Sequence, residues 1–292
     1  MNKIKISALV SALIFILCLV LYGCGPAAEP NESGADKTSS NKIAQKNNSS
    51  LGVIKKRGKL RVAVPENIPP ISYPDNEGKY KGFNVEFAKR LAEDLLGSPD
   101  KLELVPTKNA DRETVLTDDK ADISLMSYVG KPDAGQNVDF AGAYMKASVS
   151  LISLNGEVKN INDIPDKKII VCKGTVAEQF LETNYSYVNL IKVDSYDQMF
   201  KDLEEGQASA AACDMVLAYS WSAGKQKFDV SIKNLTSKGD IEAAVKKGDT
   251  ELQEWVKNEI VTLRSQDFFR HDFQNTMQAI YGGQLTARDV LL

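Results

Sequence analysis

The chain has 292 residues, of which 43% are hydrophobic and 26% are charged, and its formal net charge at pH 7 is −3. That length is enough for two modest domains with cores of their own. A net charge so close to zero, without a basic stripe interleaved with aromatic residues, argues against a nucleic-acid partner.

The N-terminus has the pattern of a secretory signal. Two lysines precede an uncharged, mainly apolar run from residue 6 to residue 21. This run is shorter than the roughly 20 residues that a membrane-spanning helix needs. The residues Leu21-Tyr22-Gly23-Cys24 resemble the lipobox of bacterial lipoproteins, although tyrosine departs from the usual second residue. The resemblance implies a signal peptide over residues 1–23 and lipidation of Cys24. An uncleaved membrane anchor is the alternative, and either one places the rest of the chain on the extracytoplasmic face.

Residues 24–50 are dominated by Pro, Asn, Ser, Lys, Glu and Gly. They cannot bury enough apolar surface to fold, so a flexible tether is expected. Beyond the tether the sequence keeps two cysteines, Cys172 and Cys213, and one histidine, His271. That set is too small for a zinc site, and neither a metal nor a cofactor is expected.

The first folded part alternates strands with helices. Short apolar runs predict strands at residues 60–64, 102–105 and 123–126. Between the first two, apolar residues recur every four positions from Phe83 to Leu95, which is typical of an amphipathic helix. A short helix starting at Thr107 or Asp111 is expected before the third strand. This alternation predicts a parallel sheet with right-handed crossovers.

A second part repeats the pattern after a strand at residues 148–154. Strands are predicted at 168–172, 190–193 and 210–213, and helices at 175–181 and 195–203. The second of these helices begins with Ser195-x-x-Gln198, the spacing of a capping box, and a last helix starts similarly at Thr250-x-x-Gln253. Two such units in succession predict two lobes.

Short motifs in a fixed order carry a family resemblance from about residue 51 to residue 265. They are Gly58-Lys59-Leu60-Arg61-Val62, Gly82-Phe83-Asn84-Val85-Glu86, Val138-Asp139-Phe140, Lys173-Gly174-Thr175 and Ala243-Ala244-Val245-Lys246-Lys247-Gly248-Asp249. Together they resemble the extracellular solute-binding proteins of amino-acid ABC transporters, the polar-amino-acid family.

The resemblance implies an α/β fold of two doubly wound lobes joined by two extended crossover strands, as in type 2 periplasmic binding proteins. Lobe 1 is then expected at residues 51–147 and 246–292, and lobe 2, with the hinge strands, at 148–245. The crossover strands fit Val149–Leu154 and Glu242–Val245. Residues 267–292 extend beyond the usual end of the family, and we expect them to pack on a lobe rather than to bind a ligand.

The resemblance also implies a ligand site between the lobes. Asp214 follows a predicted strand and matches the carboxylate that accepts the ligand's ammonium group; its alternative role is a helix N-cap. The turn Lys173-Gly174-Thr175 joins a strand to a helix start, where free N–H groups and the helix dipole favour an anion. Gly174 and Thr175 are therefore expected at the ligand's carboxylate, with a plain turn as the alternative.

Further contacts are expected where loops leave the strands of the first part. Arg112 offers a planar donor for a carboxylate, as in acidic-amino-acid binders of the family, or is a surface residue. Tyr73 is assigned to an aromatic wall of the site, with a core or rim position as its alternative. Ser127 lies directly after a predicted strand and Glu66 lies in the loop that Pro65 begins after another, and both are assigned to the same site.

The loop after Ser127 departs from the family pattern. The family's Thr-x-Thr-x-x-Arg carries an arginine that clamps the α-carboxylate, and that position is Ala134 here. Lys131 is a partial substitute, as a point charge. Without another donor, loss of the arginine would weaken amino-acid binding. The ligand is therefore predicted only as an amino acid or an amino-acid-like solute.

Cys172 and Cys213 end two strands that should be neighbours in the second sheet. We predict that the two residues lie close together. They are then either a disulfide, which an extracytoplasmic location permits, or two buried thiols.

These features predict a lipid-anchored solute-binding protein on the extracytoplasmic face. It would be a monomer that closes two lobes around a small polar ligand and delivers it to the permease of an ABC importer. It is not expected to be an enzyme. One alternative is a degenerate or sensory protein whose cleft binds no amino acid tightly. The other is a dehydratase on the same fold, for which Glu66 is the candidate acid.

Overall fold

A computed structural model describes residues 50–129, 137–154, 158–164 and 168–292. The predicted signal peptide, Cys24, the tether up to residue 49, Lys131 and Ala134 lie outside these residues. The described residues belong to one compact unit. Within them, no helix combines the length and the apolar character needed to cross a membrane.

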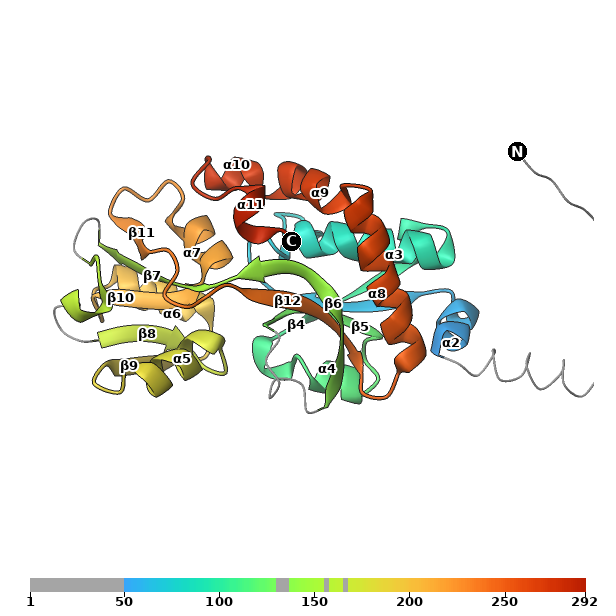
Figure 1. Cartoon of the computed structure of the whole chain (residues 1–292), viewed down its shortest axis with the longest axis horizontal. Coiled ribbons are helices and arrows are strands. Elements are labelled where there is room, and N and C mark those ends of the chain that lie inside the picture. The colour runs from blue at the N-terminus through green and yellow to red at the C-terminus, as the bar shows by residue number, and fades with distance from the viewer. Residues whose placement is uncertain (1–49, 130–136, 155–157, 165–167) are drawn as a thin grey trace, which may run out of the picture. The chain divides into compact units, whose positions relative to one another are not determined.

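The first lobe is built on a five-stranded sheet (Figure 1). Its strands, in order across the sheet, are β4 (Leu102–Thr107), β1 (Leu60–Pro65), β5 (Ile123–Val129), β12 (Gly239–Lys246) and β6 (Val138–Ala147). β1 pairs in parallel with β4 and β5, which confirms the alternation expected from the sequence. β12 is antiparallel to both of its neighbours.

Helices and short elements complete this lobe. They are α2 (Ser50–Arg57), α3 (Phe83–Leu96), α4 (Thr114–Thr117), the hairpin of β2 (Tyr73–Pro74) with β3 (Tyr80–Lys81), and 3-10 turns at Pro99–Lys101 and Asn109–Asp111.

Helix α3 fixes the loop that follows β1. The apolar residues predicted to share one face of α3 are buried, and Gly97 ends the helix with φ 82°. At the N-terminal end, Gly82 has φ 121°, and a Cβ there would stand 2.5 Å from the carbonyl oxygen of Pro70. Only glycine tolerates both conditions. The N–H of Phe83 also donates to that carbonyl at 3.0 Å, so the loop over residues 65–72 is held against α3.

The second lobe has its own five-stranded sheet. The strands, in order, are β11 (Phe228–Ile232), β7 (Val149–Leu154), β10 (Ala210–Asp214), β8 (Lys168–Cys172) and β9 (Asn189–Val193). β8 is parallel to β9 and β10, whereas β7 is antiparallel to β10 and β11. The helices are α5 (Val176–Asn184), α6 (Tyr196–Glu204) and α7 (Met215–Ser222), with a 3-10 turn at Ile161–Asp163. β11 was not predicted from the sequence.

Two helix starts differ from the predicted capping. Ser195 accepts a hydrogen bond from the N–H of Gln198 at 3.2 Å, but the Gln198 side chain donates to Asp202 instead of turning back. Only half of the predicted capping box is therefore formed. The last long helix, α8 (Thr250–Ser265), is capped by Asp249 rather than by Thr250, because a carboxylate one residue earlier reaches the free N–H groups of the first turn.

The two crossovers between the lobes are hydrogen bonded to each other. β6 continues into β7 through Ser148, and β11 continues into β12 through residues 233–238. The hydroxyl of Ser148 donates to the side chain of Asn234 at 2.7 Å, and the N–H of Leu235 donates to the carbonyl of Val149 at 2.7 Å. The hinge therefore consists of two short linkers side by side.

β12 belongs to the first sheet and not to the second lobe, with which the sequence analysis grouped it. It pairs with β5 and β6 along its length, and Ala243 and Val245 are buried in the first core. The crossing points consequently lie at Ser148 and at residues 233–238, outside the two segments predicted to cross.

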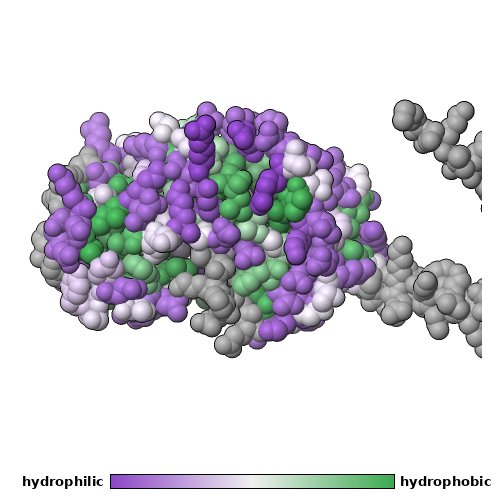
Figure 2. All heavy atoms as spheres, in the orientation of Figure 1, coloured by the Kyte–Doolittle hydropathy of each residue, from purple (hydrophilic) through white to green (hydrophobic). Residues whose placement is uncertain are grey.

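The C-terminal residues continue past α8 as α9 (Phe268–Thr276), α10 (Gln278–Tyr281) and α11 (Ala287–Val290). Phe269 packs on Phe87 of the first core with ring centroids 5.0 Å apart. The segment over residues 267–292 thus packs on a lobe, as expected. Figure 1 shows it leading from α8 towards α7 of the other lobe. On the face drawn in Figure 2, polar side chains predominate and apolar atoms appear in patches between them.

Candidate functional site

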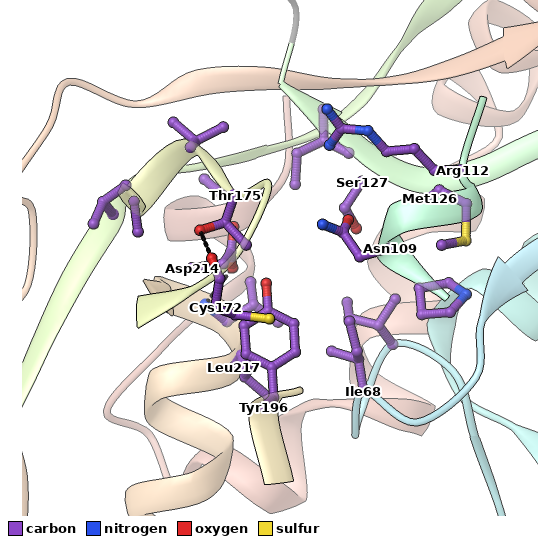
Figure 3. Close-up of a pocket in the computed structure, with 18 of the residues that line it drawn as sticks. Ile68, Asn109, Arg112, Met126, Ser127, Cys172, Thr175, Tyr196, Asp214 and Leu217 are labelled. Carbon is purple, nitrogen blue, oxygen red and sulfur yellow. Dashed lines mark hydrogen bonds between the residues drawn. The ribbon is translucent and has the colours of Figure 1, made fainter. Parts of the chain in front are cut away.

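A cavity of ≈ 740 Å³ lies between the two sheets. β1 and β4 end at it from the first lobe, and β8 and β10 end at it from the second. The carboxyl ends of parallel strands are where open α/β sheets bind ligands. Figure 3 shows Asn109, Arg112 and Ser127 of the first lobe on one side, and Thr175 and Asp214 of the second lobe on the other.

Asp214 is both the end of β10 and the N-cap of α7. Its Oδ1 accepts a hydrogen bond from the N–H of Val216 at 2.7 Å. Asp214 therefore has the helix-capping role that the sequence analysis gave as its alternative. Its carboxylate also lines the cavity. Burial raises the pKa of Asp214 to about 6, and hydrogen bonds from the N–H groups of Val216 and Leu217 only partly offset this. Among the described residues, no lysine or arginine forms an ion pair with Asp214. A cation in the cavity would stabilise its ionised form.

Arg112 lines the cavity from the first lobe, between the turn Asn109–Asp111 and α4. Its guanidinium lies over the ring of Tyr128, 5.3 Å from the centroid, and its carbonyl accepts a hydrogen bond from the Tyr128 hydroxyl. The stacking fixes the planar group at the cavity wall. Within the described parts of the chain, no carboxylate forms an ion pair with Arg112. Its donors are therefore available to an anion in the cavity.

The turn after β8 keeps only part of the predicted anion site. The N–H of Gly174 donates to Glu178 at 2.7 Å, and Gly174 does not line the cavity. The hydroxyl of Thr175 donates to the carbonyl of Cys172 at 2.7 Å (Figure 3). The N–H groups of Thr175 and Val176 have no acceptor among the described residues, and both residues line the cavity. These two groups, at the N-terminus of α5, are the anion-binding part of the turn.

Three further predicted residues differ in their placement. Glu66 lines the cavity after β1, and its carbonyl accepts a hydrogen bond from Tyr80 at 2.9 Å. Ser127 also lines the cavity, with φ 57°, beside an irregularity in the pairing of β5 with β12. Tyr73 is not among the cavity residues, because it lies in the β2–β3 hairpin, where its ring contacts Lys81 at 5.2 Å.

Tyr196 and Asn109 line the cavity and were missed from the sequence. Tyr196 is the first residue of α6, directly after a strand and its turn, and its ring stands beside Asp214 and Cys172 in Figure 3. Burial raises its pKa well above the ordinary value, so the hydroxyl stays protonated and can donate. Tyr196 could have been identified from its position, because it begins a helix directly after a strand and a turn, as Val176 does at the start of α5.

Cys172 and Cys213 are free and buried, so the disulfide that the sequence allowed is not formed. They continue the register of β8 with β10, one residue after Val171 pairs with Ala212, which places the thiols on neighbouring strands. Burial raises the pKa of Cys172 to about 11 and that of Cys213 well above its ordinary value. Both thiols therefore stay protonated, and only Cys172 lines the cavity.

Comparison with known proteins identifies similar chains. Residues 60–271 match the family described as bacterial extracellular solute-binding proteins, family 3. A glutamine-binding protein of Geobacillus stearothermophilus is 28% identical over 229 residues, which are 77% of this chain and 84% of that protein. The solute receptor for L-cysteine of Neisseria gonorrhoeae has a similar structure, with 33% identity and a TM-score of 0.79 over 84% of this chain and 100% of the receptor.

Two more similarities bear on the choice between binding and catalysis. A cysteine-binding protein of Campylobacter jejuni has 32% identity and a TM-score of 0.79, over 84% of this chain and 99% of that one. Cyclohexadienyl dehydratase of Pseudomonas aeruginosa is 29% identical over 179 residues, 60% of this chain and 66% of the enzyme. Binding proteins and one enzyme are thus both similar to this chain.

Proposed function

The chain belongs to the bacterial extracellular solute-binding proteins, family 3, and from that premise we propose that it binds a small α-amino acid as a zwitterion for an ABC importer. Its family works outside the cytoplasm and captures small polar ligands between two lobes. L-cysteine is the first candidate ligand, because two structurally similar proteins are named for cysteine, at 33% and 32% identity.

The observation that carries this proposal is a pair of opposite charges facing the same cavity from different lobes. Asp214 offers a carboxylate on one side and Arg112 a guanidinium on the other, and neither has an ion-pair partner among the described residues. Charged groups at a closing site need partners, because unpaired burial of a charge is costly. A ligand with one ammonium and one carboxylate supplies both partners.

Arg112 takes over the role of the family's carboxylate-binding arginine, whose position is Ala134 in this chain. In the proposed complex, the ligand's carboxylate lies between the Arg112 guanidinium and the N–H groups of Thr175 and Val176. These donors belong to different lobes, so a carboxylate held by all of them stabilises the closed form. The ammonium group lies on Asp214, and the hydroxyl of Tyr196 is placed to donate to the ligand.

The cellular setting is part of the same proposal. Residues 1–23 are a signal peptide, Cys24 carries lipid, and residues 24–49 tether a monomeric binding unit to the membrane; Ser50, grouped with the tether from the sequence, begins α2. The hydrophobic run, the lipobox-like cysteine and the polar composition of the tether support this. Metabolic labelling with a fatty-acid probe should mark the wild-type protein and leave Cys24→Ser unlabelled.

Isothermal titration with L-cysteine, L-cystine and L-glutamine tests the ligand. We expect one-to-one binding of at least one of them, a large loss of affinity in Asp214→Asn and Arg112→Met, and no change in Arg270→Met, whose ion pair with Asp267 is exposed and remote from the cavity. No binding of any amino acid by the folded wild-type protein would refute the proposal.

The proposal includes binding without turnover. The similarity to a dehydratase makes this testable, because Glu66 lies at the cavity and could act as an acid. Incubation of the purified protein with a cyclohexadienyl acid should give no aromatic product. Formation of such a product by the wild-type protein, and its absence with Glu66→Gln, would replace the binding function with an enzymatic one.

A further inference from the structure

The C-terminal segment over residues 267–292 contacts the first core, strand β6, helix α7 and the crossover over residues 233–238. Its α9 is anchored in the first core through Phe269 and Phe273, which are buried with 4% and 2% of their surface exposed. Leu291 forms a β-bridge with Met145 of β6, just before the crossover at Ser148. The segment therefore starts on the first lobe and ends at the hinge.

Tyr281 connects this segment to the helix that carries Asp214. Its hydroxyl donates to the carbonyl of Val216 at 3.3 Å, and its ring is stacked on Phe273, with centroids 6.2 Å apart. The N–H of the same Val216 donates to the carboxylate of Asp214. Tyr281 is 1% exposed, so its hydroxyl has no solvent alternative to this bond.

Asp289 connects the segment to the second crossover. Its carboxylate lies 3.0 Å from the ammonium of Lys233 and 3.6 Å from that of Lys238. Lys238 also donates to the carbonyl of Asp289 at 2.7 Å. The same carboxylate accepts bonds from the N–H and hydroxyl of Thr286, which fix it at the start of α11. The linker over residues 233–238 is thus tied to α11, whose Val290 is buried in the first core.

We propose that residues 267–292 form a strap across the hinge, in which Tyr281 holds the first turn of α7 and Asp289 holds the second crossover. Both are then positioning residues that keep Asp214 in its ligand-binding geometry. The proposal rests on the proposed function, because it assigns a role to the ammonium site. Neither residue lines the cavity, so each acts only through α7 or the crossover.

Two substitutions each remove one contact between the strap and the rest of the hinge while keeping the packing of the segment. Tyr281→Phe removes the hydroxyl and keeps the stacked ring. Lys233→Met removes the 3.0 Å ion pair with Asp289 and also the ammonium that lies over the ring of Tyr219 in α7. It keeps the bonds from Thr286 to Asp289. Arg270→Met is the matched control, since it removes an exposed ion pair within the strap. Ile260→Val, in the first core, is a control for a general loss of stability.

Amide hydrogen exchange, measured without ligand, tests the mechanical part. We expect faster exchange over residues 214–218 in Tyr281→Phe and over 233–238 in Lys233→Met, with wild-type rates at both in the two controls. Titration with L-cysteine tests the functional part, and a loss of roughly threefold to tenfold is expected in Tyr281→Phe, from one buried hydrogen bond. Affinity should also fall in Lys233→Met, and this loss should become smaller at high salt, because salt weakens the half-buried ion pair of the wild-type protein too.

A merely structural role gives a different result. In that case, the variants melt earlier, as Ile260→Val does, while local exchange and affinity stay at wild-type values, and the proposal is overturned. Faster exchange with unchanged affinity also overturns it. If the wild-type protein binds no amino acid, the proposed function fails, and the exchange measurement still decides whether the strap holds α7.

Discussion

Lowering the pH from 7 to 5 is expected to weaken amino-acid binding about tenfold, because Asp214 must be ionised to accept an ammonium group. Burial places the pKa of Asp214 at about 6 in the empty cavity. The carboxyl is then mostly ionised at pH 7 and mostly protonated at pH 5. If only the ionised form binds, the apparent affinity falls in proportion to the ionised fraction.

The effect on folding has the opposite sign and gives a second check. Because the pKa of Asp214 is raised in the folded protein from 3.8 to about 6, the folded state binds the proton more tightly than the unfolded state. This group therefore destabilises the empty protein at neutral pH. Its contribution to stability should improve as the pH falls from about 6 towards 4, while ligand binding deteriorates over the same interval.

Titration calorimetry with L-cysteine between pH 5 and pH 8 measures this profile. Asp214→Asn should bind at least about tenfold more weakly at pH 7 and show no step near pH 6, since asparagine keeps the helix cap but not the charge. Asp194→Asn is the control, because Asp194 lines the same cavity but is 87% exposed and paired with Lys173. A flat profile in the wild-type protein, or an unchanged step in Asp214→Asn, would refute the role of Asp214.

Three other outcomes are expected. Arg112→Met should lower affinity roughly 10- to 100-fold with little change in melting temperature, because it loses charge-assisted bonds to the ligand; wild-type affinity would exclude Arg112 from the site. Thiol titration of the delipidated mature protein under denaturing, non-reducing conditions should count both Cys172 and Cys213. In the native state it should count few or no thiols, because both are buried. Zero thiols after denaturation would indicate a disulfide. Gly82→Ala should destabilise the protein by about 2 kcal/mol or more, because a Cβ would clash with the carbonyl of Pro70; an unchanged melting temperature would contradict the close packing there.

The fold was predictable because its signals are local and periodic. The four-residue spacing of apolar residues gave α3 to within one residue at its C-terminal end, and the strand and helix alternation gave the parallel cores of both sheets. β12 was assigned to the wrong lobe because its partners, β5 and β6, are distant in sequence. No periodicity within β12 reveals which sheet it joins.

The candidate site was only partly predictable, because side chains elsewhere in the fold can occupy the groups that a sequence motif would offer to a ligand. Asp214 could be identified from its place after a buried strand, which the structure keeps. Gly174 could not be rejected from its turn motif, since the carboxylate that occupies its N–H comes from Glu178, four residues later. Tyr73 does not line the cavity because it pairs in the short β2–β3 hairpin. Tyr196 lines the cavity because it begins α6, at one of two strand-to-helix turns that meet there.

Helix α7 packs in both lobes, so the proposed recognition of the ligand's ammonium group should depend on lobe closure. Met215 and Val216, in its first turn, are buried with the first core, whereas Leu217 and Ala218 belong to the core of the second lobe. The N–H of Met215 also donates to the carbonyl of Ser148, the residue at which the first crossover passes between the lobes, at 2.9 Å.

Asp214 is one residue before this turn, so we expect it to move little when the lobes close. Thr175 and Val176 line the cavity from the second lobe and Arg112 lines it from the first, so closure of the lobes should change the distances between them. In the proposed function, a ligand would dock its ammonium group on Asp214 in the open form and gain its carboxylate contacts on closure. Asp214→Asn should then weaken both docking and closure, whereas Arg112→Met should mainly raise the rate of ligand release, which stopped-flow fluorescence of Trp221, in the same helix, can measure.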